Sequence, residues 1–131
     1  MPVEGLDHYN LRAPRAVIDA LRDFYVAVLG LEQGSRPPFR SQGYWLYAGA
    51  QPLVHLTVAG EGENRPSQVT NTLDHVALAC TDSARFEATL QKHGIHYAID
   101  EVPGTSIRQI FFSDPAGNGV ELNFAPAPEP A

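Results

Sequence analysis

Four side chains that commonly bind metals recur in a repeating pattern along this 131-residue chain. His8 is followed 67 residues later by His75, and His55 is followed 66 residues later by Glu121. Imidazole and carboxylate groups suit Zn²⁺, Ni²⁺, Fe²⁺ or Mn²⁺, whereas Ca²⁺ prefers a shell of oxygen atoms. The two spacings therefore predict one divalent metal ion held by two matched pairs, with one or two coordination positions left for water or substrate.

The sequence around these pairs is itself duplicated. Leu6-Asp7-His8 recurs as Leu73-Asp74-His75. Each copy opens an apolar, strand-like stretch, and each stretch is followed by a helical pattern that ends in a glycine, Gly30 or Gly94. Such internal similarity indicates two modules of the same architecture within one chain.

The spacing of apolar residues along the sequence indicates where the helices and strands of both modules lie. Helical periodicity predicts helices over 16–29 and 83–93, the second with Thr81 or Asp82 as its N-cap. Alternating and β-branched residues predict strands, and Asp114 to Asn118 has the composition of a tight turn. The expected strands are Leu6–Arg12, Tyr44–Ala48, Pro52–Val58, Leu73–Cys80, Tyr97–Val102, Ile107–Phe112 and Gly119–Phe124.

These elements give an α+β fold made of two βαβββ modules. We expect one domain over residues 1–124, with module one at 4–59, a polar linker at 60–71 and module two at 72–124. The proline-rich segment 36–43 is expected to form a mobile flap, and the Ala and Pro tail at 125–131 to be disordered.

Strand alternation places the metal-binding candidates away from the core. In 53–58, Val54 and Leu56 share one face while His55 and Thr57 share the other. In 119–124, Val120 and Leu122 likewise oppose Glu121. Each of these strands thus has an apolar face that can pack against a helix and an opposite face that carries a metal-binding candidate.

Composition excludes several classes of partner. The net charge is −6 with nine scattered Lys and Arg residues, which argues against nucleic acid. The sequence shows no apolar run long enough to span a membrane and no secretory signal near Met1, and the single Cys80 lies in an apolar run, where we expect a buried, inert thiol. These features predict a cytoplasmic protein.

The motifs together resemble the vicinal oxygen chelate superfamily, which includes glyoxalase I, extradiol dioxygenases, fosfomycin-resistance thiol transferases and bleomycin-binding proteins. The resemblance covers nearly the whole chain and implies an open, cup-shaped mixed sheet with helices on the outside. The segments that carry it are Leu6-Asp7-His8, the helix end Phe24 to Leu31, Leu73 to Leu78, and Asp114 to Leu122.

The resemblance implies that His8, His55, His75 and Glu121 bind the metal ion. Glyoxalase I usually has a glutamate at the position of His55, so this chain keeps one of two metal-bound carboxylates. The dioxygenases and thiol transferases use two histidines and one carboxylate, which His8, His75 and Glu121 would supply. His55 would then be a fourth ligand or a proton carrier.

We therefore expect a glyoxalase-like lyase or isomerase that chelates a small substrate through adjacent oxygens, with Glu121 or His55 moving a proton. The alternatives are a ring-cleaving non-haem Fe(II) dioxygenase, a thiol transferase, or a bleomycin-resistance-like binding protein without catalysis. Glutathione is a possible cosubstrate, and the resemblance implies a homodimer. The expected substrate-binding residues are Asn10, Trp45, Tyr47, Thr57, Arg108 and Asn123, whereas His93 and His96 are expected to lie outside the cup.

Overall fold

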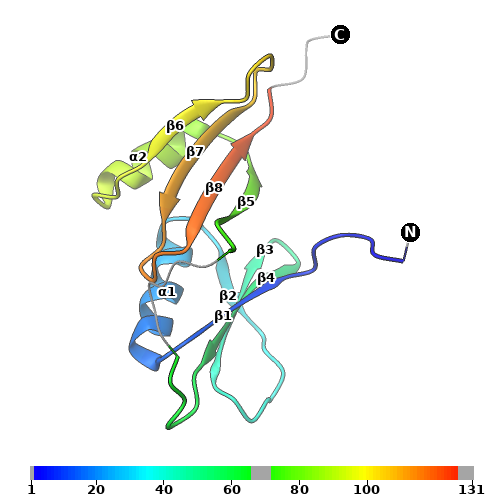
Figure 1. The fold of residues 1–131 in the computed structure, drawn as a ribbon, viewed down its shortest axis with the longest axis vertical. Helices are drawn as coiled ribbons and strands as arrows, with labels where there is room; N and C mark the ends of the chain where they lie inside the picture. Colours follow the sequence, from blue (N-terminus) through cyan, green and yellow to red (C-terminus); the bar gives the residue numbers. More distant parts are fainter. Residues whose placement is uncertain (1, 66–71, 127–131) are drawn as a thin grey trace. The chain divides into compact units, whose positions relative to one another are not determined.

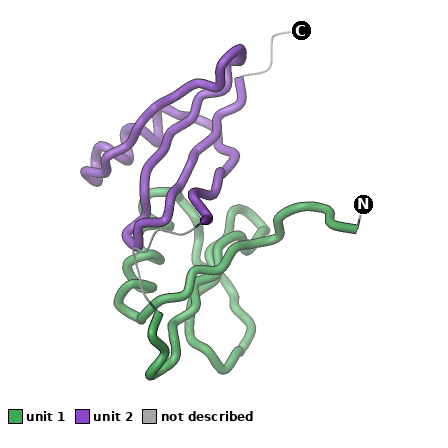
Figure 2. The backbone as a smooth tube through the Cα atoms, viewed as in Figure 1, with its two compact units in different colours: residues 1–67 green, residues 68–131 purple. Residues whose placement is uncertain are grey.

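Each half of the chain folds into one helix and one four-stranded sheet in the computed structural model, which describes residues 2–65 and 72–126 (Figure 1). The two halves are separate compact units, residues 1–67 and 68–131 (Figure 2). The division falls within the segment 60–71 that the sequence marks as a linker. Residues 66–71 of that segment and residues 127–131 of the tail lie outside the described residues.

Unit 1 contains the first helix and four strands. They are β1 (Tyr9–Ala13), α1 (Arg15–Ala27), β2 (Glu32–Gly34), β3 (Gly43–Ala48) and β4 (Gln51–Val58). The strand order is β1-β4-β3-β2, with β1 parallel to β4 and the other neighbours antiparallel. A parallel pair needs a long crossover between its strands, which here contains α1 and the β2–β3 segment.

Unit 2 repeats this arrangement. It contains β5 (His75–Cys80), α2 (Ser83–Lys92), β6 (Ala98–Glu101), β7 (Arg108–Ser113) and β8 (Gly119–Phe124). The order β5-β8-β7-β6 matches unit 1 strand for strand, and β5 runs parallel to β8. The predicted α+β class with two βαβββ modules is confirmed.

Each unit has its own apolar core on the helix side of its sheet. In unit 1, Ile18 and Leu21 of α1 are buried, as are Leu46, Val54 and Leu56 of the sheet. Unit 2 buries Leu90 of α2 together with the strand residues Ile110, Val120, Leu122 and Phe124. The strand positions in these cores are the ones that alternation assigns to the apolar face. The opposite face of each sheet is therefore available for polar side chains.

Local signals set the ends of the helices. The Asp82 carboxylate accepts a hydrogen bond from the backbone N–H of Arg85 at 3.3 Å and caps α2, as predicted. Gly30 and Gly94 adopt φ of 73° and 66°, the left-handed conformation that terminates a helix at glycine with little strain. The short strand β2 was not among the predicted elements. The described residues contain no helix that is both long and apolar enough to cross a membrane.

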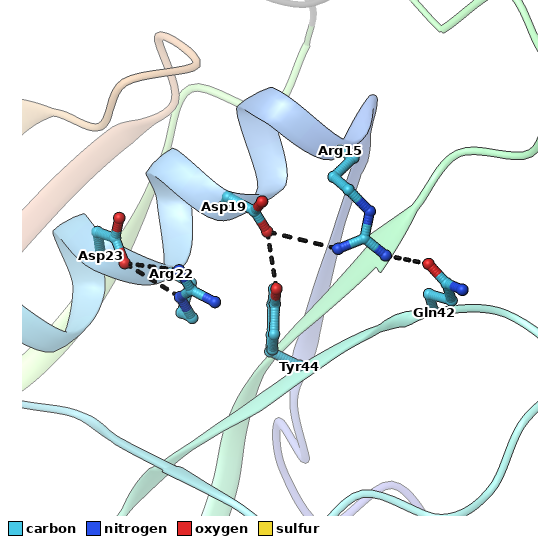
Figure 3. Close-up of polar contacts among 6 residues, drawn as sticks. All are labelled: Arg15, Asp19, Arg22, Asp23, Gln42 and Tyr44. Carbon is cyan, nitrogen blue, oxygen red and sulfur yellow. Dashed lines mark hydrogen bonds and ion pairs between the residues drawn. The ribbon is translucent and has the colours of Figure 1, made fainter.

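A polar network joins α1 to the start of β3 (Figure 3). The hydroxyl of Tyr44 donates to Asp19 at 2.7 Å, and the guanidinium of Arg22 lies 4.6 Å from the centre of the Tyr44 ring. Arg15 donates to the side chain of Gln42, the residue just before β3. These contacts attach the end of the β2–β3 loop, residues 35–42, to the helix.

Candidate metal centre

Each of the two duplicated histidines has an aspartate beside its Nδ1 atom. His8 lies just before β1 and His75 begins β5. The Nδ1 atom of His8 lies 2.6 Å from a carboxylate oxygen of Asp7, and Nδ1 of His75 lies 2.8 Å from Asp74. A neighbouring carboxylate holds the proton on Nδ1 and leaves Nε2 as the metal-binding atom, an arrangement common around metal-bound histidines.

Strand register preserves the duplication. Asn10 is opposite His55 across β1 and β4, and Ala77 is opposite Glu121 across β5 and β8. Asn10 follows His8 by two residues, and Ala77 follows His75 by two residues. The pair His8 and His55 therefore occupies the same strand positions in unit 1 as the pair His75 and Glu121 in unit 2. Alternation puts both members of each pair on the same face of their sheet.

In unit 2 the two side chains of the pair contact each other. Nε2 of His75 lies 3.2 Å from Oε1 of Glu121. Two imidazole or carboxylate donors about 2.1 Å from a tetrahedral ion would be about 3.4 Å apart, close to this separation. Glu121 is buried, and its Oε2 accepts from Gln109 at 3.3 Å and Asn123 at 3.1 Å. Those bonds orient the carboxylate and leave Oε1 beside the imidazole.

The electrostatics of this pair favour a cation. The hydrogen bond to Asp74 raises the pKa of His75, and the charge of Glu121 raises it further, although burial opposes both. The same negative groups that stabilise a proton on His75 would stabilise a metal ion. The donor set of unit 2 therefore fits a divalent metal.

In unit 1 the pair is arranged differently. The ring of His55 stacks on Trp45 at 4.0 Å and on His8 at 3.7 Å, with interplanar angles of 12° and 14°. Its Nε2 donates to the carbonyl of Pro52 at 3.0 Å. Burial lowers the pKa of His55, and the charge of His8 lowers it further. The lowered pKa favours the neutral imidazole, in which Nε2 carries the proton and Nδ1 the lone pair.

Stacked imidazoles cannot share one ion as they stand. A metal ion bound to a ring nitrogen lies near the plane of that ring, and the two nearly parallel planes of His8 and His55 do not meet close to the rings. One ring must turn before both can ligate. Among residues 2–65 and 72–126, three or more metal-capable side chains do not gather at any one point.

Two glycines permit close strand contacts beside the pairs. A Cβ on Gly119 would lie 2.3 Å from the carbonyl oxygen of Asp74 and 2.9 Å from Cβ of His75. A Cβ on Gly43 would lie 1.9 Å from the carbonyl oxygen of Leu56. Both distances are shorter than van der Waals contact, so only glycine allows β8 to approach His75 and β3 to approach the strand that carries His55.

Several predicted substrate-binding residues lie on the faces that carry the pairs. Asn10 donates to Thr57 at 2.9 Å in unit 1, and Asn123 contacts Glu121 in unit 2. Trp45 forms the stack with His55. Tyr47 instead donates to the carbonyl of Ser35 at 2.6 Å and so ties down one end of the β2–β3 loop.

Arg108 lies on the other side of its sheet. It shares the alternation of the buried Ile110 and Phe112 and pairs with Glu87 of α2 at 2.9 Å. The opposite face of β7, on the same side of the sheet as His75 and Glu121, carries Gln109 and Phe111. Gln109 contacts Glu121. The ring of Phe111 meets that of His75 edge-on at 6.1 Å. The buried side chains of Ile110 and Phe112 place Arg108 on the core side of the sheet, so Gln109 rather than Arg108 stands beside Glu121.

Comparison with known proteins agrees with this architecture. A family model described as the Glyoxalase/Bleomycin resistance protein/Dioxygenase superfamily matches residues 5–122. The chain is 34% identical over 110 residues to glyoxylase I 4 of Arabidopsis thaliana, a match that covers 80% of this chain and 63% of that protein. It therefore spans less than two thirds of this relative.

Solved structures share the fold. The glyoxalase family protein from Enterococcus faecalis is 25% identical, with a TM-score of 0.66 over 94% of this chain and 99% of that one. Lactoylglutathione lyase from Agrobacterium tumefaciens is 22% identical, with a TM-score of 0.64 over 95% and 96%. At that identity the second likeness concerns the fold alone. With its duplicated modules, matched pairs and family match over residues 5–122, the chain belongs to the glyoxalase, bleomycin resistance protein and dioxygenase superfamily.

Proposed function

We propose that this chain is a metal-dependent lyase or isomerase of the glyoxalase type, in which His8, His55, His75 and Glu121 bind one divalent metal ion. One observation carries the proposal: Nε2 of His75 and Oε1 of Glu121 lie 3.2 Å apart. Both groups are held by further hydrogen bonds, as metal ligands usually are.

The bound ion, Zn²⁺, Ni²⁺, Fe²⁺ or Mn²⁺ by the nature of these ligands, would polarise two adjacent oxygens of a small substrate. The chain's own residues do the rest. Asp7 and Asp74 fix the orientation of the two duplicated histidines. Glu121 provides a buried carboxylate oxygen that can accept a proton, and His55 provides a neutral nitrogen for the same task.

A second reaction class is favoured by the surroundings of His55. Trp45 and the carbonyl of Pro52 hold this ring away from a ligand geometry. His8, His75 and Glu121 would then act as a set of two histidines and one carboxylate, which suits a non-haem Fe(II) dioxygenase or a thiol transferase.

The alternative that is not an enzyme is a protein that binds a small molecule without catalysis. Its support is the aromatic group of Phe39, Trp45 and His55, where Phe39 lies 6.1 Å from Trp45. Aromatic faces of this kind can hold a flat ligand without any metal. We also propose, from the family resemblance, that the substrate is a small molecule and that the protein is a homodimer.

Metal analysis combined with a substrate screen tests these proposals. The purified protein is loaded with each of the four ions, dialysed, and offered hemithioacetals with and without glutathione, catechols and epoxides. We expect one ion per chain and turnover of a hemithioacetal. Turnover of a catechol or an epoxide would show that the protein catalyses a different reaction from the proposed one. A protein that retains no metal would support the binding protein without catalysis.

A further inference from the structure

The β2–β3 loop carries an arginine without an acidic partner. Four arginines in the described residues are half-buried, and three of them pair with a carboxylate. Arg36 is the exception, because no carboxylate oxygen among the described residues lies within ion-pair distance of its guanidinium. The three pairs are Arg12 with Glu63 at 2.9 Å, Arg22 with Asp23 at 3.0 Å, and Arg108 with Glu87 at 2.9 Å.

The hydrogen-bonding capacity of Arg36 is only partly used. Its Nη1 donates to the carbonyl of Ser41 and its Nη2 to the hydroxyl of the same residue, both at 3.0 Å. Its Nε is buried and has no hydrogen-bond partner among the described residues. A guanidinium has five N–H donors arranged as a fork that fits a carboxylate, and one N–H on each Nη remains for an anionic acceptor.

The location of Arg36 connects it to the metal-binding residues of unit 1. Its guanidinium lies 5.0 Å from the centre of the Phe39 ring, Phe39 lies beside Trp45, and Trp45 stacks on His55. The positive charge of Arg36 also contributes to lowering the pKa of His55, which places the two groups within electrostatic reach of each other.

Both ends of the loop are anchored to regular structure. Tyr47 binds Ser35 at the start of the loop, and Gln42 at its end is held by Arg15 of α1 (Figure 3). The charge of Arg36 is therefore presented at a defined place beside the aromatic rings.

We propose that Arg36 binds a carboxylate of the substrate, so that the substrate is a small acid whose anionic end lies apart from the two oxygens that chelate the metal ion. The inference rests on the proposed function, because it assigns a substrate class to the same site. It also gives the role expected of Arg108 to a different residue, since Arg108 is already neutralised by Glu87.

Two hydroxamates of similar size test this inference. Succinic acid monohydroxamate and butyrohydroxamate both chelate a metal through two adjacent oxygens, but only the first has a carboxylate at its far end. The fluorescence of Trp45, the one tryptophan of the chain, reports binding to the metal-loaded protein. A charge-assisted hydrogen bond corresponds to a preference of about tenfold or more for the acid over the neutral probe.

Variants in the same loop provide the matched control. Arg36→Gln should bring the ratio of the two affinities close to one, and Arg36→Lys should keep part of the preference because it keeps the charge. Arg40→Gln removes an exposed arginine four residues away and should keep the full preference. Equal binding of both probes by the natural chain, or an unchanged ratio in Arg36→Gln, would overturn the inference.

Binding of the neutral probe, butyrohydroxamate, shows whether a failed test concerns Arg36 alone or the proposed metal site as a whole. Butyrohydroxamate depends on the metal and not on Arg36, so His75→Ala should weaken its binding and Arg36→Gln should not. If neither probe binds the metal-loaded natural chain, both the chelating site and the role of Arg36 are wrong.

Discussion

The two modules carry equivalent pairs on equivalent strands, but they arrange them in opposite ways. In unit 2, Nε2 of His75 and Oε1 of Glu121, the two candidate ligand atoms, lie 3.2 Å apart. In unit 1, His55 is stacked on His8 and its Nε2 is bonded to a backbone carbonyl. The duplicated backbone places the paired residues at equivalent positions, and the neighbouring side chains decide how the two members of each pair are arranged.

The neighbouring strand supplies much of the difference. Trp45 stands opposite His55 on β3, and Phe111 stands opposite Glu121 on β7. The indole of Trp45 covers the face of His55, whereas Phe111 meets His75 edge-on and leaves its Nε2 beside Glu121. We infer that unit 2 provides the preorganised half of the metal set and unit 1 the adaptable half.

The largest effect is expected from removing the charge of the unit 2 pair. Glu121→Gln keeps the size of the side chain and the partners of Oε2 but replaces the negative ligand oxygen with a neutral amide. We expect a loss of metal affinity on the order of 100-fold or more, since outer partners alone account for about 10- to 100-fold. Titration with Zn²⁺ against a competing chelator measures it, and an affinity within a few-fold of the natural chain would contradict the ligand role.

The partner of His75 should matter less than the ligand itself. Asp74→Asn retains a hydrogen-bond acceptor but removes the carboxylate that holds the proton on Nδ1. We expect metal affinity to fall about 10- to 100-fold. Asp7→Asn is the matched change in unit 1, and it should weaken metal binding less because the unit 1 ring must turn before it ligates. An equal loss in both variants would remove the distinction between the modules.

The pKa of His75 provides a further comparison, between the natural chain and Asp74→Asn. His75 must be neutral to bind metal, and its pKa is raised mainly by Asp74 and also by Glu121. In the metal-free protein His75 should therefore keep its proton to a higher pH than an ordinary histidine does. In Asp74→Asn this titration should move to lower pH, as measured by NMR of the metal-free protein between about pH 8 and pH 5. A titration that does not move would show that Asp74 does not control this proton.

The smallest effect is expected from the remaining histidines. His93 and His96 are exposed and lie near the end of α2. The double change to Gln should leave metal content and probe binding within about twofold of the natural chain, because neither side chain shares a strand face with the pairs. A large loss of metal would mean that the assignment of strand faces is wrong.

Much of the scaffold could be predicted because it depends on short-range patterns. The period of two in β4 and β8 places Val54, Leu56, Val120 and Leu122 in the core. The Asp82 cap depends on neighbouring residues alone. The strand β2 escaped prediction because its three residues, Glu32 to Gly34, are too few to show a period and are all exposed.

The details of the candidate site could not be predicted because they depend on long-range contacts. The sequence did not reveal that Arg108 faces α2 and that Gln109 stands beside Glu121. The bond from His55 to Pro52 and the stacking on Trp45 depend on side-chain orientations that no spacing encodes. The sequence therefore predicted which residues form pairs, but not how the side chains of each pair are arranged.

Metal content of two single variants tests the central claim most directly. His75→Ala and His55→Ala each remove one imidazole from equivalent modules, and both proteins are loaded with Zn²⁺, dialysed and analysed by mass spectrometry of the metal. We expect His75→Ala to lose most of its metal and His55→Ala to lose a smaller part, because the ring of His55 is held by Trp45 and Pro52 and must turn before it ligates. Full stoichiometric metal in His75→Ala together with an empty His55→Ala would contradict this expectation.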